Sequence, residues 1–288
     1  MGVLIVCKDA LFDEENVFGK VQIKEPDVPA EPKTIADYPV QDGLQGLYDL
    51  GEDYGLVNEN DLWSPINYAP TDAYYQPTDT PQFAGNCNIE ENYVTFSGKG
   101  SDARMHTYLR IPLVAGATDG YDGHNGLTYV ALFSVPGGTL KERPIIGNRT
   151  SSIPNLSLTN AHVFFARNGA SVTNCVFGGD GAINSNAFVI LAMTADANGF
   201  KVMRYKDGAL DTVPLVVDGV KVNAYEGVVD AWSNLAIQIG GNSTSTNYAD
   251  AHISLAAVHT GKLTDEQLEE VCEFVYDYGK NTKDLDIE

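Results

Sequence analysis

The stretch near the end of the chain constrains the fold most. His252 to His259 is a short apolar run of the length of a strand, and Thr260-Gly261 is typical of a turn. Thr264 then stands three residues before Gln267, which is the spacing of a capping box at the start of a helix. The sequence therefore predicts a strand, a tight turn and one helix in direct succession.

The helix that begins at this cap is predicted to be amphipathic. Its buried face consists of four apolar residues at helical spacing: Leu268, Val271, Cys272 and Val275. Asp265 and Glu266 lie in the first turn, where the helix dipole favours anions. Gly279 stands where a helix C-cap favours glycine. We therefore expect a helix over about 264–278.

Composition and charge limit the classes of partner. The chain has 288 residues, of which 43% are hydrophobic, so it has enough apolar material for a packed core. Its formal net charge is -21, which argues against nucleic acid or an anionic membrane as a partner, since both need clustered Lys and Arg. The acidity favours solubility. No stretch is long and apolar enough to span a bilayer, and the first residues lack the basic start of a secretion signal. We therefore expect no membrane insertion.

The four cysteines form no recognisable motif. Cys7, Cys87, Cys175 and Cys272 are far apart, so no C-x-x-C pair indicates zinc binding or redox chemistry. We interpret them as reduced, mostly buried small apolar residues. A disulfide between Cys87 and Cys175 stays open as an alternative.

Strand-like runs follow one another along most of the chain. Leu127 to Val135 is nearly all apolar, as is typical of a buried strand. Phe188 to Met193 and Phe200 to Tyr205 are two runs joined by Asn198-Gly199, a hairpin signal. Leu235 to Ile239 is a further apolar run. This succession predicts an antiparallel β-sandwich.

The order of these pieces resembles a known family. Gly43 to Leu50, Leu127 to Val135, Arg143 to Gly147, Tyr205 to Gly208, Leu235 to Gly241 and Leu263 to Glu266 are similar, in this order, to the strands and closing helix of concanavalin A-like domains of the laminin-G/pentraxin type. The resemblance implies an all-β fold, a concanavalin A-like jelly-roll β-sandwich with a short C-terminal helix. The resembling pieces span about Gly43 to Tyr278, and the domain is predicted over residues 43–288.

Residues 1–42 are predicted to be a separate attachment segment. The start, from Val3 through KDALFDEENVFGKVQI, resembles the N-termini of fibre and tail proteins from phages and prophages that infect Bacteroidales. Prolines at 26, 29, 32 and 39 indicate a stiff, extended spacer after it. This resemblance implies other virion structural proteins as partners through the N-terminal segment, and a homo-oligomer. An ordinary edge of the sandwich is the alternative interpretation.

Motifs for catalysis are missing. Glu25, Asp27 and Glu31 form the nearest acidic triplet to that of laminarinase-like glycosidases, but the spacing differs and the interleaved prolines exclude a central strand. The sequence has no G-x-S-x-G, H-E-x-x-H or P-loop motif. We therefore predict that the chain is not an enzyme.

One acidic, glycine-rich loop could hold a metal. Asp119, Asp122 and Asn125 supply hard oxygen ligands of the kind that Ca²⁺ takes. The loop lacks the register and the bidentate Glu of an EF-hand, and a polar turn is the preferred interpretation. We therefore expect no cofactor, with Ca²⁺ at this loop as the alternative.

Carbohydrate binding would use exposed rings beside amides. Trp63, Tyr74 and Tyr75 lie in a long irregular stretch, and Asn242 and Asn247 flank a polar hairpin tip. Rings that merely cover the ends of the core are the alternative. We take these five residues as the candidate glycan site.

These observations lead to three hypotheses. The first is a phage virion structural protein, in the fibre, the tail or attached to the capsid, whose jelly roll adheres to host-surface or mucosal glycans. The second is a non-catalytic, lectin-like protein of a bacterial cell surface or extracellular space. The third is an enzyme, which the missing motifs disfavour.

Overall fold

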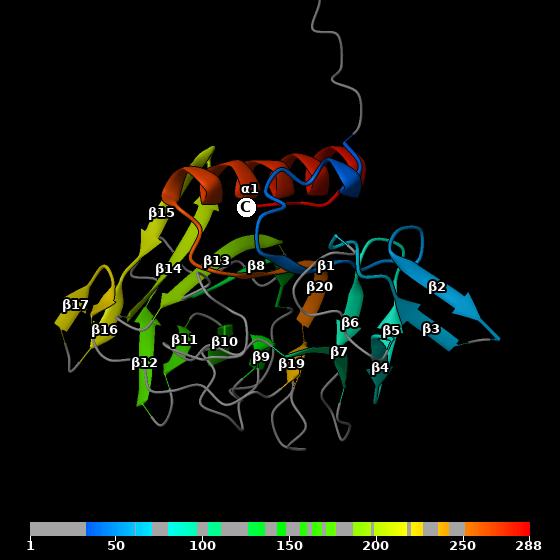
Figure 1. The fold of residues 1–288 in the computed structure, drawn as a ribbon, viewed down its shortest axis with the longest axis horizontal. Coiled ribbons are helices and arrows are strands. Elements are labelled where there is room, and N and C mark those ends of the chain that lie inside the picture. Colours follow the sequence, from blue (N-terminus) through cyan, green and yellow to red (C-terminus); the bar gives the residue numbers. More distant parts are fainter. Residues whose placement is uncertain are drawn as a thin grey trace, which may run out of the picture. The chain divides into compact units, whose positions relative to one another are not determined.

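The structure is a computed structural model in which the chain divides into two units, residues 1–31 and 32–288. It describes residues 33–60, 62–70, 80–96, 103–110, 126–135, 143–147, 156–159, 163–168, 171–176, 187–196, 199–217, 220–226, 236–241 and 251–288. The second unit is a β-sandwich with one α-helix near the end of the chain (Figure 1), which confirms the predicted fold class.

One sheet, called sheet I below, lies in the middle of the molecule (Figure 1). Its strands run in the order β15, β14, β13, β8, β20, β6, β5, with β1 paired to β20 and β18 paired to β14. Their bounds are β1 Leu44–Asp49, β5 Cys87–Ile89, β6 Val94–Phe96, β8 Leu127–Ser134, β13 Val189–Asp196, β14 Gly199–Lys206, β15 Ala209–Val213, β18 Tyr225–Glu226 and β20 Ala251–Thr260.

The second sheet, sheet II, packs against one face of sheet I. Its strands run in the order β17, β16, β12, β11, β10, β9, β19, β7, β4. Their bounds are β4 Gln82–Ala84, β7 Arg104–Arg110, β9 Arg143–Gly147, β10 Leu156–Thr159, β11 Val163–Asn168, β12 Ser171–Val176, β16 Leu215–Val217, β17 Val220–Val222 and β19 Ala236–Ile239. A separate hairpin joins β2, Leu56–Glu59, to β3, Leu62–Pro65.

Strand β20 is central to sheet I because its residues are apolar on both faces. It pairs along its length with β8, and on its other side with β6 and then β1, always antiparallel. Ile253 and Val258 point into the core between the sheets, whereas Leu255 and Ala257 point to the opposite face. The strand predicted over 252–259 is therefore confirmed.

The main core lies between the two sheets. Alternate residues of β8 and β13 face it from sheet I, and Met105, Ile237 and Ile239 face it from sheet II. Alternation places the neighbouring side chains of β7 and β19 on the outer face of sheet II.

A second apolar cluster lies on the outer face of sheet I, beneath helix α1, Asp265–Asp277. The helix begins as predicted: the Thr264 side chain accepts a hydrogen bond from the Gln267 backbone N–H, and the Gln267 side chain accepts one from the Thr264 N–H. Its four predicted inward residues are all buried: Leu268, Val271, Cys272 and Val275. Burial of each such side chain contributes about 1.5–3 kcal/mol.

Gly279 does not end the helix in the way the sequence predicted. Helix α1 continues into a wider π-type turn, Tyr278–Thr282, so no left-handed glycine closes it. The glycine is instead needed for close packing. A Cβ at this position would lie 2.7 Å from Leu132 Cδ2 and 2.8 Å from Ile287 Cδ1.

The folded unit also begins earlier than residue 43. Ile35, Tyr38 and Val40 are buried in the cluster under the helix, and a short 3₁₀ turn, η1, spans Ile35–Asp37. Residues 33–42 are therefore part of the sandwich and not an extended spacer. The predicted attachment role of residues 1–31 lies outside the described residues and stays a prediction.

A buried ion pair ties the end of the chain to β1. The Lys283 ammonium donates to Asp49 Oδ1 at 2.6 Å and to the Leu50 and Ser254 carbonyl oxygens, each at 3.1 Å. The Tyr278 hydroxyl donates to the other Asp49 oxygen. Burial lowers the pKa of Lys283, and the Asp49 carboxylate opposes this shift. Every donor and acceptor of the pair is thereby satisfied.

Two further expectations can be compared with the structure. Cys87 and Cys272 are free thiols, so the alternative disulfide between Cys87 and Cys175 does not form. Within the described ranges, no helix has both the length and the apolarity that crossing a membrane requires.

Candidate functional site

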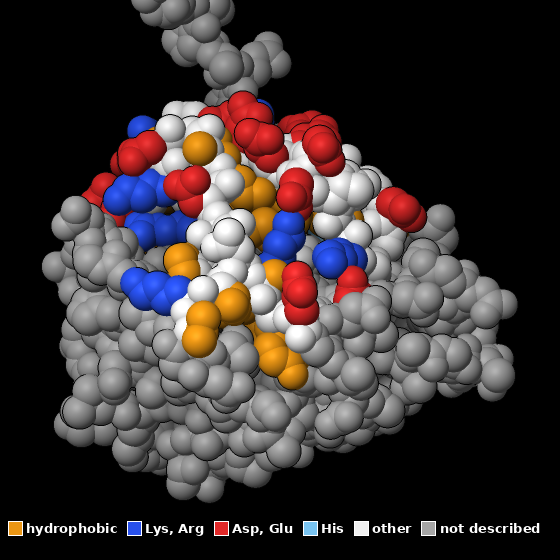
Figure 2. Space-filling model, turned by 90° about the vertical axis from the view of Figure 1, so that its left-hand side faces the viewer, with side chains coloured by type: hydrophobic (Ala, Val, Ile, Leu, Met, Phe, Trp, Pro, Cys, Tyr) orange, Lys and Arg blue, Asp and Glu red, His pale blue; other side chains and the backbone are white. Residues whose placement is uncertain are grey.

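A hollow of about 410 Å³ opens where the β13–β14 hairpin, strand β18 and the turn after β20 meet. Six side chains dominate its lining: Asp196, Phe200, Lys201, Tyr225, Glu226 and Lys262. Figure 2 shows the side of the molecule that lies on the left of Figure 1. Lysine and arginine side chains are interspersed there with acidic ones, beside a group of hydrophobic side chains.

A glycine brings β18 against the hairpin to form the hollow. Gly199 pairs with Glu226 and has a φ of 152°, a conformation that side chains other than glycine rarely adopt. A Cβ on Gly199 would lie 1.8 Å from the Tyr225 carbonyl oxygen. No other residue would allow β18 to pair at this distance, so the hairpin signal in the sequence also marks the rim of the hollow.

An aromatic pair gives the hollow an apolar side. Phe200 is buried in the core between the sheets, and the Tyr225 ring stacks on it at 5.1 Å between centroids and 22° between planes. Tyr225 itself is half-buried. The arrangement fixes the Tyr225 ring at the surface by contact with a rigid core residue.

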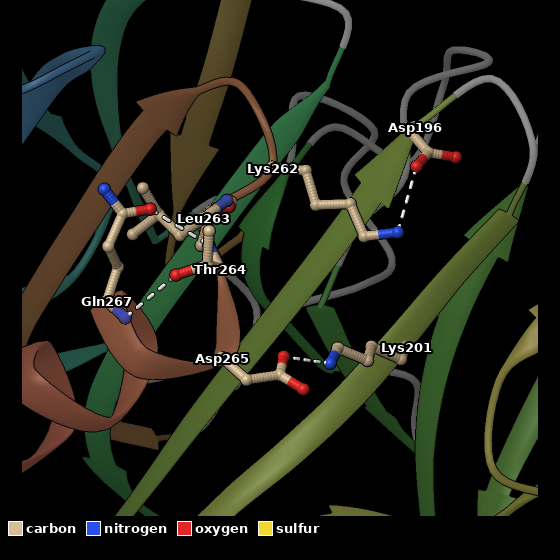
Figure 3. A network of polar contacts seen from close by, with 8 residues as sticks. Asp196, Lys201, Lys262, Leu263, Thr264, Asp265 and Gln267 are labelled. Atoms are coloured by element: carbon tan, nitrogen blue, oxygen red, sulfur yellow. Dashed lines mark hydrogen bonds and ion pairs between the residues drawn. The ribbon is translucent and has the colours of Figure 1, made fainter.

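Charged side chains of both signs line the hollow together with this ring. Figure 3 shows two ion pairs at this place, Lys262 with Asp196 and Lys201 with Asp265. The Lys262 ammonium contacts Asp196 Oδ2 at 2.9 Å, and the Lys201 ammonium contacts Asp265 at the first turn of α1. The Lys262 side chain is 44% exposed and that of Asp265 is 71% exposed. Exposed pairs of this kind contribute only about 0–1 kcal/mol each, so their partners can change at little cost when a ligand binds.

The capping box holds the charged residues in place. The Leu263 backbone N–H donates to Thr128 Oγ1 at 3.1 Å, which fixes the turn to the neighbouring strand β8. Thr264 and Gln267 then set the direction of the helix, as Figure 3 shows. Lys262 and Asp265 therefore project from a rigid backbone.

This combination suits binding of a hydroxyl-rich ligand. Carboxylates accept hydrogen bonds from hydroxyl groups, ammonium groups donate to them, and the tyrosine ring offers an apolar face. Glu226 forms no ion pair with another described residue, so its carboxylate is available as an acceptor. Among the described lining residues there is no Ser, Cys or His that could act as a nucleophile or base.

None of the residues predicted from the sequence is among the described residues that line the hollow. Trp63 is on β3, half-buried, and packs against the core between the sheets. Strand β3 is on the right of Figure 1 and β14 on the left, so Trp63 does not belong to the hollow. The remaining predicted residues are outside the described part of the chain: Tyr74, Tyr75, Asn242 and Asn247 for glycan, and Asp119, Asp122 and Asn125 for calcium.

Sequence reasoning missed the residues of the hollow because they come from distant segments. Lys201 and Lys262 are on β14 and the turn before α1, and Tyr225 is on a two-residue strand. Only Asn198-Gly199 carried a local signal, and that signal indicated a hairpin. Over the residues described, no group of His, Cys, Asp and Glu side chains could hold a metal ion.

Comparisons with known proteins bear on the fold. No protein-family model matches the chain, and no curated protein matches it. Among solved structures, the sialidase of Trypanosoma rangeli in complex with sialic acid is similar, with a TM-score of 0.52 and 14% identity over 85% of this chain and 34% of the sialidase. The binding domain of botulinum neurotoxin DC in complex with SialylT gives a TM-score of 0.49 and 14% identity over 82% of this chain and 52% of that domain.

The likeness to the sialidase is one of fold. The chain spans about a third of the sialidase, at 34% of its length. The likeness nevertheless corrects one prediction. Because the sequence lacks known catalytic motifs, we predicted that the chain is not an enzyme. The structural comparison, however, finds the same fold within the structure of an enzyme, the sialidase. The prediction is therefore wrong.

Proposed function

We propose that this chain binds carbohydrate and that the hollow beside Tyr225 holds a sugar ring. The observation that carries the proposal is the aromatic ring, fixed on Phe200, with carboxylates and ammonium groups around it. A sugar ring has an apolar face of C–H groups and a rim of hydroxyls, so it can use both kinds of contact at once. The alternating charges favour a neutral ring over a strongly charged one.

The named ligand of the similar sialidase structure supports this proposal. That structure is a complex with sialic acid, which is a sugar. The sialidase likeness shows that this fold occurs in a protein that handles glycans.

The test is a titration of the full chain with neutral monosaccharides, followed by calorimetry or by NMR. Tyr225→Leu keeps an apolar side chain on Phe200 but removes the flat ring, and should weaken binding about tenfold, which corresponds to about 1.4 kcal/mol. Glu226→Gln should weaken binding less. Glu269→Gln, an exposed change on α1, is the matched control and should leave binding unchanged.

The proposal fails if no neutral sugar binds, or if Tyr225→Leu binds as tightly as the natural chain while melting at the same temperature. If Glu269→Gln weakens binding as much as Glu226→Gln, the sugar is held by general electrostatics and not by the hollow.

The biological setting of this binding stays the hypothesis drawn from the sequence. The resemblance of Val3 to Ile23 to the N-termini of fibre and tail proteins supports display on a virion, with attachment to other virion proteins and a homo-oligomer. A lectin-like protein at a bacterial cell surface is the alternative. Electron microscopy of virions labelled with an antibody against the chain would distinguish them.

A further inference from the structure

The ion pair of Lys283 and Asp49 lies where water does not reach it. The Lys283 side chain is 0% exposed and that of Asp49 is 1% exposed. The Tyr54 ring covers the ammonium group, whose nitrogen lies 4.4 Å from the ring centroid. Two opposite charges are therefore held together in a dry, partly aromatic site, where the cost of removing both from water offsets much of their attraction.

The contacts of Lys283 hold its nitrogen against the Asp49 carboxyl group. Nζ lies 2.6 Å from Asp49 Oδ1, and it also donates to the Leu50 and Ser254 carbonyl oxygens, each at 3.1 Å. An ammonium group has three hydrogens, so each of these acceptors takes one. The nitrogen therefore has one defined orientation, in which one hydrogen points at Oδ1.

Transfer of that hydrogen converts the pair into two uncharged groups that can react. When it passes from Nζ to Oδ1, Lys283 becomes an amine and Asp49 becomes a carboxylic acid. Burial lowers the pKa of Lys283 and so favours the amine, although the Asp49 carboxylate opposes the shift. The lone pair left on Nζ points at the carboxyl group, and holding two reactants in such a position accelerates the reaction between them.

The Tyr278 hydroxyl is placed to assist this reaction. It donates to the other Asp49 oxygen, Oδ2. Attack of an amine on a carboxyl carbon places negative charge on that oxygen, and a donor aimed at it stabilises the charge. Burial, with the neighbouring Asp49, raises the pKa of Tyr278, so the phenol keeps its hydrogen for this contact.

We propose that Lys283 and Asp49 join covalently after folding, through an amide bond between Nζ and Cγ. The neutral Nζ attacks Cγ, and the bond from Cγ to Oδ1 breaks. Oδ1 leaves as water, with the carboxyl hydrogen and one hydrogen from Nζ, while Oδ2 stays as the amide oxygen beside the Tyr278 hydroxyl. One amine and one carboxylic acid give one amide and one water, so no oxidant or other reactant is required. The hydrogen-bond distance between Nζ and Oδ1 corresponds to the pair before reaction.

The product fits the same site. The single amide N–H can still donate to the Leu50 carbonyl oxygen, and the Ser254 carbonyl oxygen also accepts from the Leu50 backbone N–H at 2.8 Å. A neutral amide in place of two buried charges removes the cost of keeping those charges from water. The bond fastens β1 to the segment after α1, and so restricts the unfolded chain as a disulfide does.

Mass spectrometry of the full chain, unfolded in denaturant, tests for the bond. The intact mass of folded and aged protein should be lower than the mass of its sequence by one water molecule. Digestion with trypsin should then yield a branched peptide that contains both Asp49 and Lys283. If aged protein keeps the full mass and yields no branched peptide, the proposal is overturned.

Replacements at the pair test the chemistry. Lys283→Arg keeps the positive charge but has no amine that can become neutral, so this variant should keep its full mass. Asp49→Asn keeps the size of the side chain and should lose ammonia in place of water. Tyr278→Phe keeps the ring and removes the hydroxyl, so the bond should form more slowly after refolding, by about tenfold or more. Lys280→Met, at an exposed lysine of the same π-type turn, is the matched control and should form the bond as the natural chain does.

A second source of water loss must be separated from the bond. An Asp-Gly pair such as Asp207-Gly208 can lose water by closing to a cyclic imide. Hydroxylamine reacts with a cyclic imide and leaves an amide intact, so the mass of the natural chain should not change when it is added. If Lys283→Arg loses the same mass as the natural chain, the water comes from elsewhere and the proposal is overturned. Should a variant fail to fold, the branched peptide of the natural chain still decides.

Discussion

The two sheets have opposite kinds of outer face. On sheet I, helix α1 and residues 33–42 cover an apolar surface, and the buried ion pair of Lys283 and Asp49 is fully hydrogen-bonded, although the buried Thr194 hydroxyl on this face has no partner. On sheet II, the buried Gln238 amide has one atom without a partner. A buried polar group that is left unpaired costs stability, whereas one that is fully paired does not. The two faces therefore differ in what lies on them and not in whether every buried polar atom is paired. The outer face of sheet I, covered by helix α1, is called the structural face below, whereas a polar row of Gln82, His106 and Gln238 crosses the outer face of sheet II.

The largest effect is expected where the structural face is broken. Lys283→Met leaves the Asp49 carboxylate buried without its cation, and should lower the free energy of unfolding by about 3–5 kcal/mol in denaturant titrations. The double variant Lys283→Met/Asp49→Leu should recover at least half of the loss. Lys280→Met, an exposed lysine nearby, should change stability by less than about 0.5 kcal/mol. Equal effects of Lys280 and Lys283 would show that the buried pair has no special role.

The second prediction concerns where the structural face begins. A chain that starts at Lys33 should melt close to the full chain. One that starts at Gly43 loses the buried Ile35, Tyr38 and Val40, and should lose about 3 kcal/mol, or roughly 10 °C in Tm. Calorimetry of the two shortened chains measures the difference. Equal melting temperatures would show that residues 33–42 do not stabilise the sandwich, and the folded unit would then begin after residue 42.

The third prediction is a pH dependence on the same face. His259 is buried, its Nδ1 donates to the Asp42 carbonyl at 3.3 Å, and its Nε2 accepts from the Tyr38 hydroxyl at 3.0 Å. Burial lowers its pKa from 6.5 to about 4. Between these two pH values the unfolded chain binds more protons than the folded chain, so stability is complete above pH 6.5 and falls as the pH falls. We expect a loss of about 2 kcal/mol by pH 5.

The matched variant for this titration is His259→Gln, which can still bond the Tyr38 hydroxyl but does not titrate. Its stability should vary less between pH 7 and pH 5 than that of the natural chain. Parallel curves for the two proteins would assign the acid sensitivity to other groups.

The smallest effect is expected on the outer face of sheet II. Gln82 is exposed at the end of the polar row, so Gln82→Ala should change the free energy of unfolding by less than about 0.5 kcal/mol. A loss above about 2 kcal/mol in denaturant titrations would show that this face also serves the fold, and would remove the contrast between the two sheets.

Local signals in the sequence predicted the elements well. Thr264 and Gln267 fixed the start of the helix because a capping box involves neighbours only, and the apolar runs identified β8, β13 and β19 as interior strands. Asn198-Gly199 predicted the hairpin between β13 and β14, because Asn-Gly is favoured in the two-residue turns of hairpins. The role of Gly279 was predicted wrongly because it depends on contacts made by the fold. The side chains that leave no room for a Cβ there belong to Leu132 and Ile287, and the sequence around Gly279 does not reveal either contact.

The hollow and the polar row were beyond such signals. The hollow joins Lys201, Tyr225 and Lys262 only because β18 pairs with β14 and the turn after β20 passes nearby. The row on sheet II depends on the register between β4, β7, β19 and β9, which a single sequence does not reveal. Trp63, predicted as a glycan contact, lies half-buried on β3 and packs against the core, and its role in glycan binding stays a prediction.

The central position of β20 in sheet I has a consequence for folding during synthesis. Its partners β1, β6 and β8 are all synthesised earlier, yet none of them can complete sheet I until residues 251–260 have emerged. Until then the nascent chain carries open strand edges and uncovered apolar faces, which are the features that lead to aggregation or chaperone binding. A ribosome that stops short of residue 260 would therefore release a chain in which β1, β6 and β8 lack their shared partner and sheet I cannot close.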